Sequence, residues 1–288
     1  MQMYFMQRLS DHVYFIEGEN RGKYPFCNCL FVKDETRALM DTGAGKIIKN
    51  IEADCVFNSH WHEDHITYNS HFNKIFIHEK DAEAAESYNE FKKRYGLSDE
   101  LLKPFIYFKF SKVSKRLKDG DRFDLGNTTL SIVYTPGHSQ GHCCFLIEDN
   151  IKIIYLGDID LSSFGPWYGC LDSDLQSFIE SINKIKEIVE SENVKIVVSS
   201  HREVLKDKIV DALDSYLNKI FEREEKLLGL LKKGRRIDEL VGKGIIYRKF
   251  GEPKKAFEHF ERVMLEQHLD RLLKLGKVDR VNEKWISI

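Results

Sequence analysis

Three histidines and two carboxylates fall within six consecutive residues of this 288-residue chain. They form the run His-Trp-His-Glu-Asp-His at 60–65, which follows the apolar residues 55–57. In a loop that leaves a strand, side chains two residues apart can converge on one ion, while the next Asp and His turn toward a second. Imidazole nitrogen and carboxylate oxygen suit Zn²⁺, with bonds of roughly 2.0 to 2.2 Å. The run therefore predicts a metal site.

Three further candidate ligands are His138, Asp158 and His201. Each of them follows its own apolar run after a short turn. The preceding runs are short and rich in β-branched residues, as in β-strands. If these strands lie side by side in one sheet, their carboxyl ends meet at one edge, where α/β folds bind ligands. Each residue alone is weak evidence. Together with the first cluster, the three predict one composite site.

The run at 60–65 resembles the HxHxDH motif of the metallo-beta-lactamase superfamily, and the later His, Asp and His match that family in order and spacing. The resemblance covers residues 8–204. It implies a four-layered αββα sandwich with two metal positions at one edge. One metal would be held by His60, His62 and His138, the other by Asp64, His65 and His201, with Asp158 bridging them.

The resemblance also implies the chemistry of the site. Two metal ions would lower the pKa of a shared water from about 15.7 toward neutrality, producing a hydroxide, and would polarise the scissile carbonyl or phosphoryl oxygen. This requires an ionised Asp64, as a ligand or to orient the hydroxide. Asp41, in an Asp-Thr-Gly turn, would orient a ligand imidazole, or else serve as a simple turn or cap. We expect two Zn²⁺ per chain, although iron and manganese accept the same ligands.

Differences within the superfamily narrow the reaction. Flavodiiron oxygen reductases carry Glu at the position of His62, and the best-known zinc beta-lactamases carry Cys at the position of Asp158, so both chemistries are disfavoured. The full ligand set resembles glyoxalase II, lactonases and zinc-dependent nucleases, while persulfide dioxygenases keep some positions around one iron. We expect hydrolysis of a small-molecule thioester, lactone or related ester. The alternatives are an endoribonuclease acting on single-stranded RNA and a binding protein without activity.

The aromatic segment 164–170 follows Asp158 closely and contains Trp167 and Tyr168. Such a loop can form the wall of a small-molecule pocket, and plain core packing is an equal alternative. The motif offers no obvious acid for the leaving group. Metal-bound water or Tyr168 is the candidate for that role.

Composition bounds the class of protein. Hydrophobic residues make up 42% of the chain and charged residues 31%, as in an ordinary soluble globular protein. No run approaches the roughly 18 to 20 apolar residues of a membrane helix, so we expect a cytoplasmic protein. The six cysteines show no CxxC or disulfide-dense pattern and are expected to be reduced.

The chain divides into an α/β part, 1–204, and a mainly helical part, 205–288. In the first part, helices are expected over 81–95 and 171–190, the latter capped by Asp172 or Ser173. The second part carries 20 Lys and Arg against 15 Asp and Glu.

Residues 205–288 are expected to form a long helix, a short helix, a longer helix and then a hairpin around Asn282. This order resembles a winged helix. A lactamase-beta-like subgroup of the superfamily, which includes an enzyme that cleaves single-stranded RNA, carries such a C-terminal domain. The longer helix mixes both charges, so we favour a segment that caps the site or mediates homo-oligomerisation. Nucleic-acid binding is the alternative.

Overall fold

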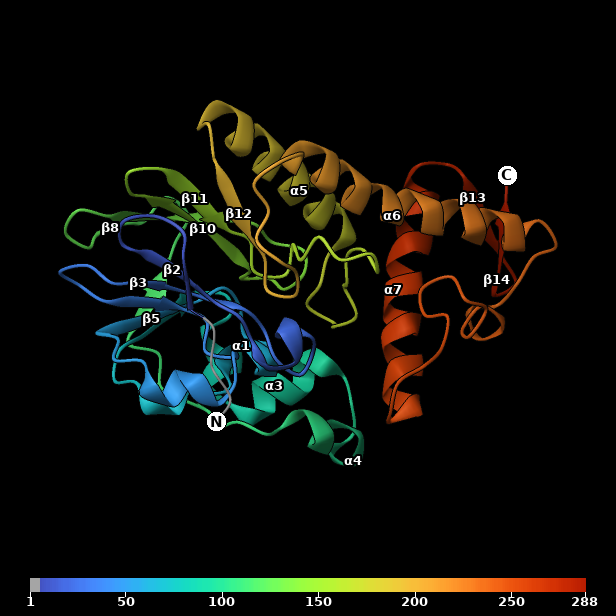
Figure 1. Cartoon of the computed structure of the whole chain (residues 1–288). Helices are drawn as coiled ribbons and strands as arrows, with labels where there is room; N and C mark the ends of the chain where they lie inside the picture. Colours follow the sequence, from blue (N-terminus) through green and yellow to red (C-terminus); the bar gives the residue numbers. More distant parts are fainter. Residues whose placement is uncertain (1–5) are drawn as a thin grey trace.

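The computed structural model describes residues 6–288, in which two β-sheets pack face to face (Figure 1). In these residues the first sheet has seven strands paired in chain order, namely β1 (Met6–Arg8), β2 (Val13–Ile16), β3 (Cys29–Val32), β4 (Ala38–Met40), β5 (Cys55–Asn58), β6 (Ile75–His78) and β7 (Lys115–Leu117). The second has the order β12-β11-β10-β9-β8, with β8 (Arg122–Asp124), β9 (Thr129–Tyr134), β10 (Cys143–Glu148), β11 (Lys152–Tyr155) and β12 (Ile196–Val198).

Strand side chains alternate between the two faces of each sheet. In β11, Ile153 and Tyr155 join the apolar cluster between the sheets, whereas Ile154 joins the cluster beneath the outer helices. In β9, Ile132 faces inward and Val133 outward in the same way. Because both faces are buried, these strands are continuous apolar runs in the sequence, and this made them recognisable.

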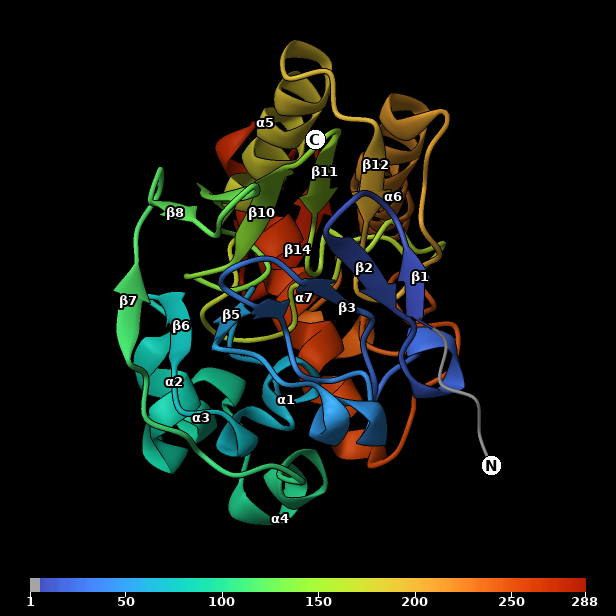
Figure 2. The ribbon, with the colours of Figure 1, turned by 60° about the vertical axis from the view of Figure 1, so that its left-hand side comes forward.

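Helices cover the outer faces of both sheets, which gives the expected α–β–β–α layering (Figures 1 and 2). On the outer side of the first sheet lie α1 (Glu63–Ile66), α2 (Ala82–Glu86), α3 (Tyr88–Tyr95), α4 (Asp99–Leu102) and the 3₁₀ turn η2 (Lys46–Asn50). Against the second sheet pack α5 (Leu175–Ser191) and α6 (Ile209–Leu231). Further 3₁₀ turns are η1 (Glu19–Gly22), η3 (Asn69–His71), η4 (Lys103–Phe105) and η5 (Ile237–Glu239).

Two predicted helix boundaries are wrong. Helix α5 begins at Leu175, and its cap is Asp174, whose side chain accepts a hydrogen bond from the Ser177 N–H at 2.6 Å. Asp172 is buried and accepts hydrogen bonds elsewhere, so it is not free to cap the helix. The helix expected over 81–95 is interrupted at Ser87, whose side chain caps α3.

The C-terminal segment contains the elements expected from its sequence, in the expected order. After α6 and η5 come α7 (Lys254–Lys274) and a hairpin of β13 (Val278–Val281) and β14 (Lys284–Ser287), which turns at Asn282 and Glu283 with positive φ. One apolar cluster runs without a break from α5 through α6 and α7 to Trp285. The winged-helix assignment and a domain boundary at 204/205 therefore stay predictions.

Two further observations concern the described residues. None of the helices within 6–288 is both long and apolar enough to span a bilayer. All six cysteines are buried and unpaired, as the sequence indicated.

Candidate metal centre and its cavity

The seven predicted ligands lie in the segments that follow β5, β9, β11 and β12, with Asp64 and His65 in the short helix α1. These segments meet at one edge of the sandwich. The turn after β11 requires glycine: Gly157 has φ of 54°, and a Cβ there would lie 2.7 Å from His142 Nε2. This tight turn places Asp158 directly beside the loop from β5. The strand ends therefore bring together residues separated by up to 141 positions in the chain.

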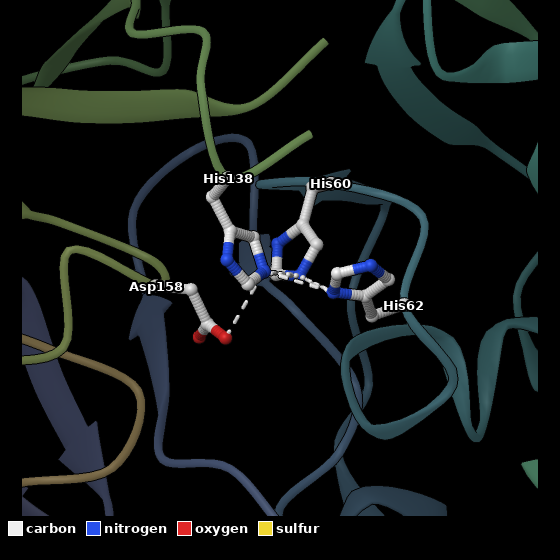
Figure 3. Close-up of side chains that lie close together, drawn as sticks. All are labelled: His60, His62, His138 and Asp158. Atoms are coloured by element: carbon white, nitrogen blue, oxygen red, sulfur yellow. Dashed lines mark hydrogen bonds and ion pairs between the residues drawn. The ribbon is translucent and has the colours of Figure 1, made fainter. Parts of the chain in front are cut away.

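The first group consists of three imidazoles that face one another (Figure 3). His60 Nε2 lies 3.0 Å from His62 Nδ1 and 3.1 Å from His138 Nε2, and His62 Nδ1 lies 2.8 Å from His138 Nε2. A neutral imidazole has a single N–H, and His138 donates its own from Nδ1 to the carbonyl of Trp167 at 2.9 Å. Its Nε2 therefore presents a lone pair to the other two nitrogens. This arrangement of three nitrogens is more typical of ligands around a cation than of a hydrogen-bonded cluster.

The second group comprises Asp64, His65 and His201. His65 Nε2 and His201 Nε2 lie 3.7 and 3.4 Å from Asp64 Oδ2. Asp158 stands between the two groups: its Oδ2 is 3.2 Å from His138 Nε2, and its Oδ1 is 3.0 Å from His65 Nε2 and 3.4 Å from His201 Nε2. One carboxylate thus turns one oxygen to each group.

The opposite ring nitrogens of these imidazoles are held by acceptors. His65 Nδ1 donates to Asp41 Oδ2 at 2.7 Å, His201 Nδ1 donates to the carbonyl of Gly22 at 2.6 Å, and His60 Nδ1 contacts Ser59 Oγ at 3.0 Å. Such partners fix the orientation of each ring and direct its other nitrogen toward the centre. The contact expected of Asp41 is therefore present in the structure.

Charge is distributed unequally between the two groups. Burial lowers the pKa of His60 and His62 well below the usual value, so their rings are neutral. Burial opposes protonation of His201 as well, but the carboxylates of Asp158 and Asp64 raise its pKa to about 10. For the carboxyl group of Asp64, burial itself raises the pKa, because it disfavours the charged form. A cation entering the second group would replace the proton that His201 holds at neutral pH.

The residues present fit divalent metal ions. His65 Nε2 and Asp158 Oδ1 are buried and make no hydrogen bond although they are 3.0 Å apart. Buried polar atoms without partners are rare in native proteins and indicate a missing ion or water. In a tetrahedral zinc site with Zn–N bonds of roughly 2.0–2.1 Å, ligand nitrogens lie about 3.3 Å apart, close to the spacings of the first group.

A cavity of about 920 Å³ opens beside these groups. Five of the predicted ligands line it: His62, Asp64, His138, Asp158 and His201. Trp167 lines it as predicted, but the expectation that Tyr168 faces the pocket is wrong. Tyr168 is fully buried, its hydroxyl is 2.6 Å from His268 Nε2, and it accepts a hydrogen bond from Arg223. It therefore cannot serve as an acid for a leaving group in the cavity.

Several residues that line the cavity were not singled out from the sequence. Glu63, inside the motif, is buried and accepts hydrogen bonds from Tyr24 (2.7 Å) and Tyr95 (2.5 Å), and burial raises its pKa to about 7. The position of Glu63 between the predicted ligands His62 and Asp64 could have indicated from the sequence that it lies at the site. Tyr247, Phe257 and Phe260 come from the C-terminal segment, and no feature of their local sequence marks them as lining residues.

A buried ion-pair cluster supports the loops that carry the ligands. Arg94 Nη1 donates to Asp81 at 2.9 Å and to Asp172 at 3.0 Å. Asp172 also accepts from the indole N–H of Trp61 (3.1 Å), which lies between His60 and His62 in the chain. Asp81 accepts from Ser139 Oγ and the Gly141 N–H in the loop that carries His138. The cluster therefore ties together the two loops that form the first group.

Comparison with known proteins identifies the family. Residues 25–201 match the model of the metallo-beta-lactamase superfamily, and the chain belongs to this superfamily. It is similar in fold to a metallo-beta-lactamase family protein from Thermus thermophilus, with a TM-score of 0.70 and 18% sequence identity over 98% of this chain and 100% of that one. The predicted superfamily and sandwich fold are confirmed.

Three curated relatives are informative. An atrochrysone carboxyl ACP thioesterase from Pseudocercospora fijiensis is 24% identical, over 98% of this chain and 82% of its own length. A beta-lactamase-like protein 2 homolog from Caenorhabditis elegans is 22% identical, over 82% of this chain and 76% of its own. A hydroxyacylglutathione hydrolase from Francisella philomiragia is 33% identical, over 33% of this chain and 34% of its own. The chain is a hydrolase of this superfamily, with a His and Asp cluster able to hold metal.

Proposed function

We propose that this protein hydrolyses a small-molecule thioester, lactone or related ester with two divalent metal ions, for which Zn²⁺ is the first candidate. His60, His62 and His138 would hold one ion, and Asp64, His65 and His201 the other. Asp158, which turns one oxygen to each group, would bridge them. Support comes from the convergence of imidazole nitrogens and carboxylate oxygens in both groups and from the buried atoms without hydrogen-bond partners.

When bound, the metal ions would supply Lewis acidity to the reacting carbonyl and lower the pKa of water. The chain itself contributes positioning. Asp64, which lines the cavity, would orient an attacking water by accepting its hydrogen bond. Asp41 holds the ring of His65 through the 2.7 Å hydrogen bond, so that His65 Nε2 keeps its direction. The aromatic part of the cavity lining would remove apolar groups of the substrate from water.

The observation that carries the proposed substrate class is the cavity itself. The C-terminal segment covers the ligand edge and contributes Tyr216 from α6, and Phe257 and Phe260 from α7, to one cavity with the ligands. The names of two relatives, a thioesterase and a hydroxyacylglutathione hydrolase, support a thioester.

The RNA alternative would require a basic path that leads to the ligands. Two cationic side chains of the C-terminal segment are paired with acids: Arg262 contacts Asp238, and Arg271 contacts Glu224 at 2.6 Å. Paired side chains are less available to phosphates. Because the names of two relatives instead support a thioester, we do not propose ribonuclease activity.

The test is turnover of a panel of thioesters and lactones by zinc-loaded protein. We expect hydrolysis of at least one thioester by the wild type and its loss in His62→Ala. The matched control is His71→Ala, because His71 belongs to neither ligand group, and it should keep wild-type activity. Absence of turnover across the panel, together with His62-dependent cleavage of single-stranded RNA, would overturn the proposal.

A further inference from the structure

A series of aromatic rings leads from the metal ligands into the C-terminal segment. The ring of His62 lies 5.5 Å from that of Trp167, and Trp167 lies 5.5 Å from Phe260. Phe260 is 5.9 Å from Phe257, which is 5.5 Å from Tyr247. All five side chains line the same cavity. The rings therefore form one continuous wall, which we call the aromatic wall: Trp167, Tyr247, Phe257 and Phe260.

Most of this wall offers no hydrogen-bonding group to a ligand. The indole N–H of Trp167 donates to the hydroxyl of Tyr247 at 2.6 Å. The two phenylalanines have no polar atoms. Apart from the hydroxyl of Tyr247, a ligand lying against the wall meets ring faces and edges, and such a surface favours apolar and aromatic groups.

The cavity is larger than a short acyl group needs. At about 920 Å³ it lies near the upper end of the range of roughly 300–1,000 Å³ that is typical of pockets for drug-sized molecules. An acetyl or lactoyl group bound at the ligands would leave the aromatic wall in contact with water. A large planar acyl group would cover it, and removal of this apolar surface from water favours binding.

Building on the proposed thioester hydrolysis, we propose that the substrate carries a bulky aromatic acyl group that binds against the aromatic wall. Three of the four wall residues come from the C-terminal segment, 205–288. That segment thus selects the acyl group, whereas the loops of the sandwich hold the reacting carbonyl. Removal of one ring should weaken binding of aromatic acyl groups and leave short acyl groups unaffected.

The experiment compares N-acetylcysteamine thioesters of acetate, benzoate and 2-naphthoate with zinc-loaded full-length protein. We expect kcat/KM to rise from acetyl to naphthoyl. Phe257→Ala should lower the naphthoyl value by about tenfold, the effect of losing a hydrophobic contact in a specificity pocket, and leave the acetyl value within about twofold. Phe257 is only half-buried, so the variant should fold. The control is Phe221→Ala, which removes a half-buried ring of α6 that does not line the cavity.

A binding measurement separates this inference from the proposed reaction. Binding of 2-naphthoate to the metal-free protein would be measured by tryptophan fluorescence. We expect Phe257→Ala to raise the dissociation constant about tenfold and Phe221→Ala to leave it unchanged. Hydrolysis that favours acetyl, or that falls equally for all acyl groups in Phe257→Ala, would overturn the inference and leave the proposed function standing. If no thioester is hydrolysed, the proposed function fails, and binding of naphthoate that does not depend on Phe257 would then overturn the inference as well.

Discussion

The two walls of the cavity differ in origin and in chemistry. The ligand wall is built by loops after β5, β9, β11 and β12 and presents ring nitrogens and carboxylate oxygens. The aromatic wall is built by the loop around Trp167 and by the C-terminal segment, and it presents ring surfaces. The contrast is consistent with the proposed division of work, in which the sandwich would carry out the reaction and the C-terminal helices would select the substrate. Changes at the ligand wall should affect every substrate, and changes at the aromatic wall only some.

The largest effect is expected from Asp158→Ala, because this side chain faces both ligand groups. Metal ions contribute several kcal/mol to stabilising the transition state, so activity should fall by about 1,000-fold or more for every substrate. Asp160→Ala is the matched control: Asp160 also lines the cavity but belongs to neither ligand group. Bound metal, measured by elemental analysis, and kcat/KM should both fall in Asp158→Ala and stay at the wild-type level in Asp160→Ala. Retention of full metal content and activity in Asp158→Ala would remove the bridging role.

Metal removal should lower thermal stability. Ions at about 1,000 times their dissociation constant stabilise the folded chain by about 4 kcal/mol. For a chain of this size, we expect a chelator to lower Tm by about 8 °C, measured by circular dichroism. Phe257→Ala should show the same chelator-dependent shift, because its ring belongs to the aromatic wall. A Tm that does not respond to chelator in the wild type would contradict a resident metal.

Asp41→Asn tests whether the hydrogen bond that Asp41 accepts from His65 helps the second group to bind metal. The variant weakens the charge-assisted hydrogen bond to His65 Nδ1, and loss of such a partner typically lowers metal affinity by about 10–100-fold. Calorimetry should show the larger loss for the second group, because Asp41 reaches the first group indirectly, through Ser59 Oγ. Asp124→Asn, which changes an exposed carboxylate on β8, should have no effect. Equal weakening of both metals would show that Asp41 acts on the whole fold.

The smallest effect concerns charge at the exposed part of the cavity. Lys23 is exposed, lines the cavity and makes no ion pair within residues 6–288. An exposed ionic contact contributes about 0.2–1 kcal/mol. Lys23→Gln should therefore raise KM about threefold for glutathione thioesters, which carry carboxylates, and leave neutral N-acetylcysteamine thioesters unchanged. Lys33→Gln, an exposed control outside the cavity, should change neither value, and an equal rise for both thioester types would exclude an electrostatic role.

The ligand wall could be predicted from the sequence because each of its residues is chemically distinctive and follows an apolar strand. His138, Asp158 and His201 fall where strand ends meet, so their convergence followed from the strand assignments. The strand pattern gave an α/β architecture, because a strand buried on both faces is a continuous apolar run, and the resemblance to the superfamily added the sandwich.

The aromatic wall could not be predicted in this way. Trp167 and Tyr247 are 80 residues apart, and an aromatic side chain can pack against many partners. Trp167 and Tyr168 are neighbours in an irregular loop, where no periodicity tells which one faces the cavity. That Tyr168 turns inward depends on Arg223 and His268, two distant residues of α6 and α7.

Helix capping was ambiguous for a simpler reason. Asp172, Ser173 and Asp174 all have side chains that can cap a helix. Only the tertiary contacts of Asp172 with Trp61 and Arg94 exclude it from that role.

The central claim, two metal positions that share Asp158, is tested most directly by counting bound ions. Metal-free full-length protein would be titrated with Zn²⁺ and, after removal of free metal, the bound zinc per chain measured by elemental analysis. We expect two equivalents, consistent with the two groups that meet at Asp158. A plateau at one equivalent, or no retained zinc, would contradict the proposed centre.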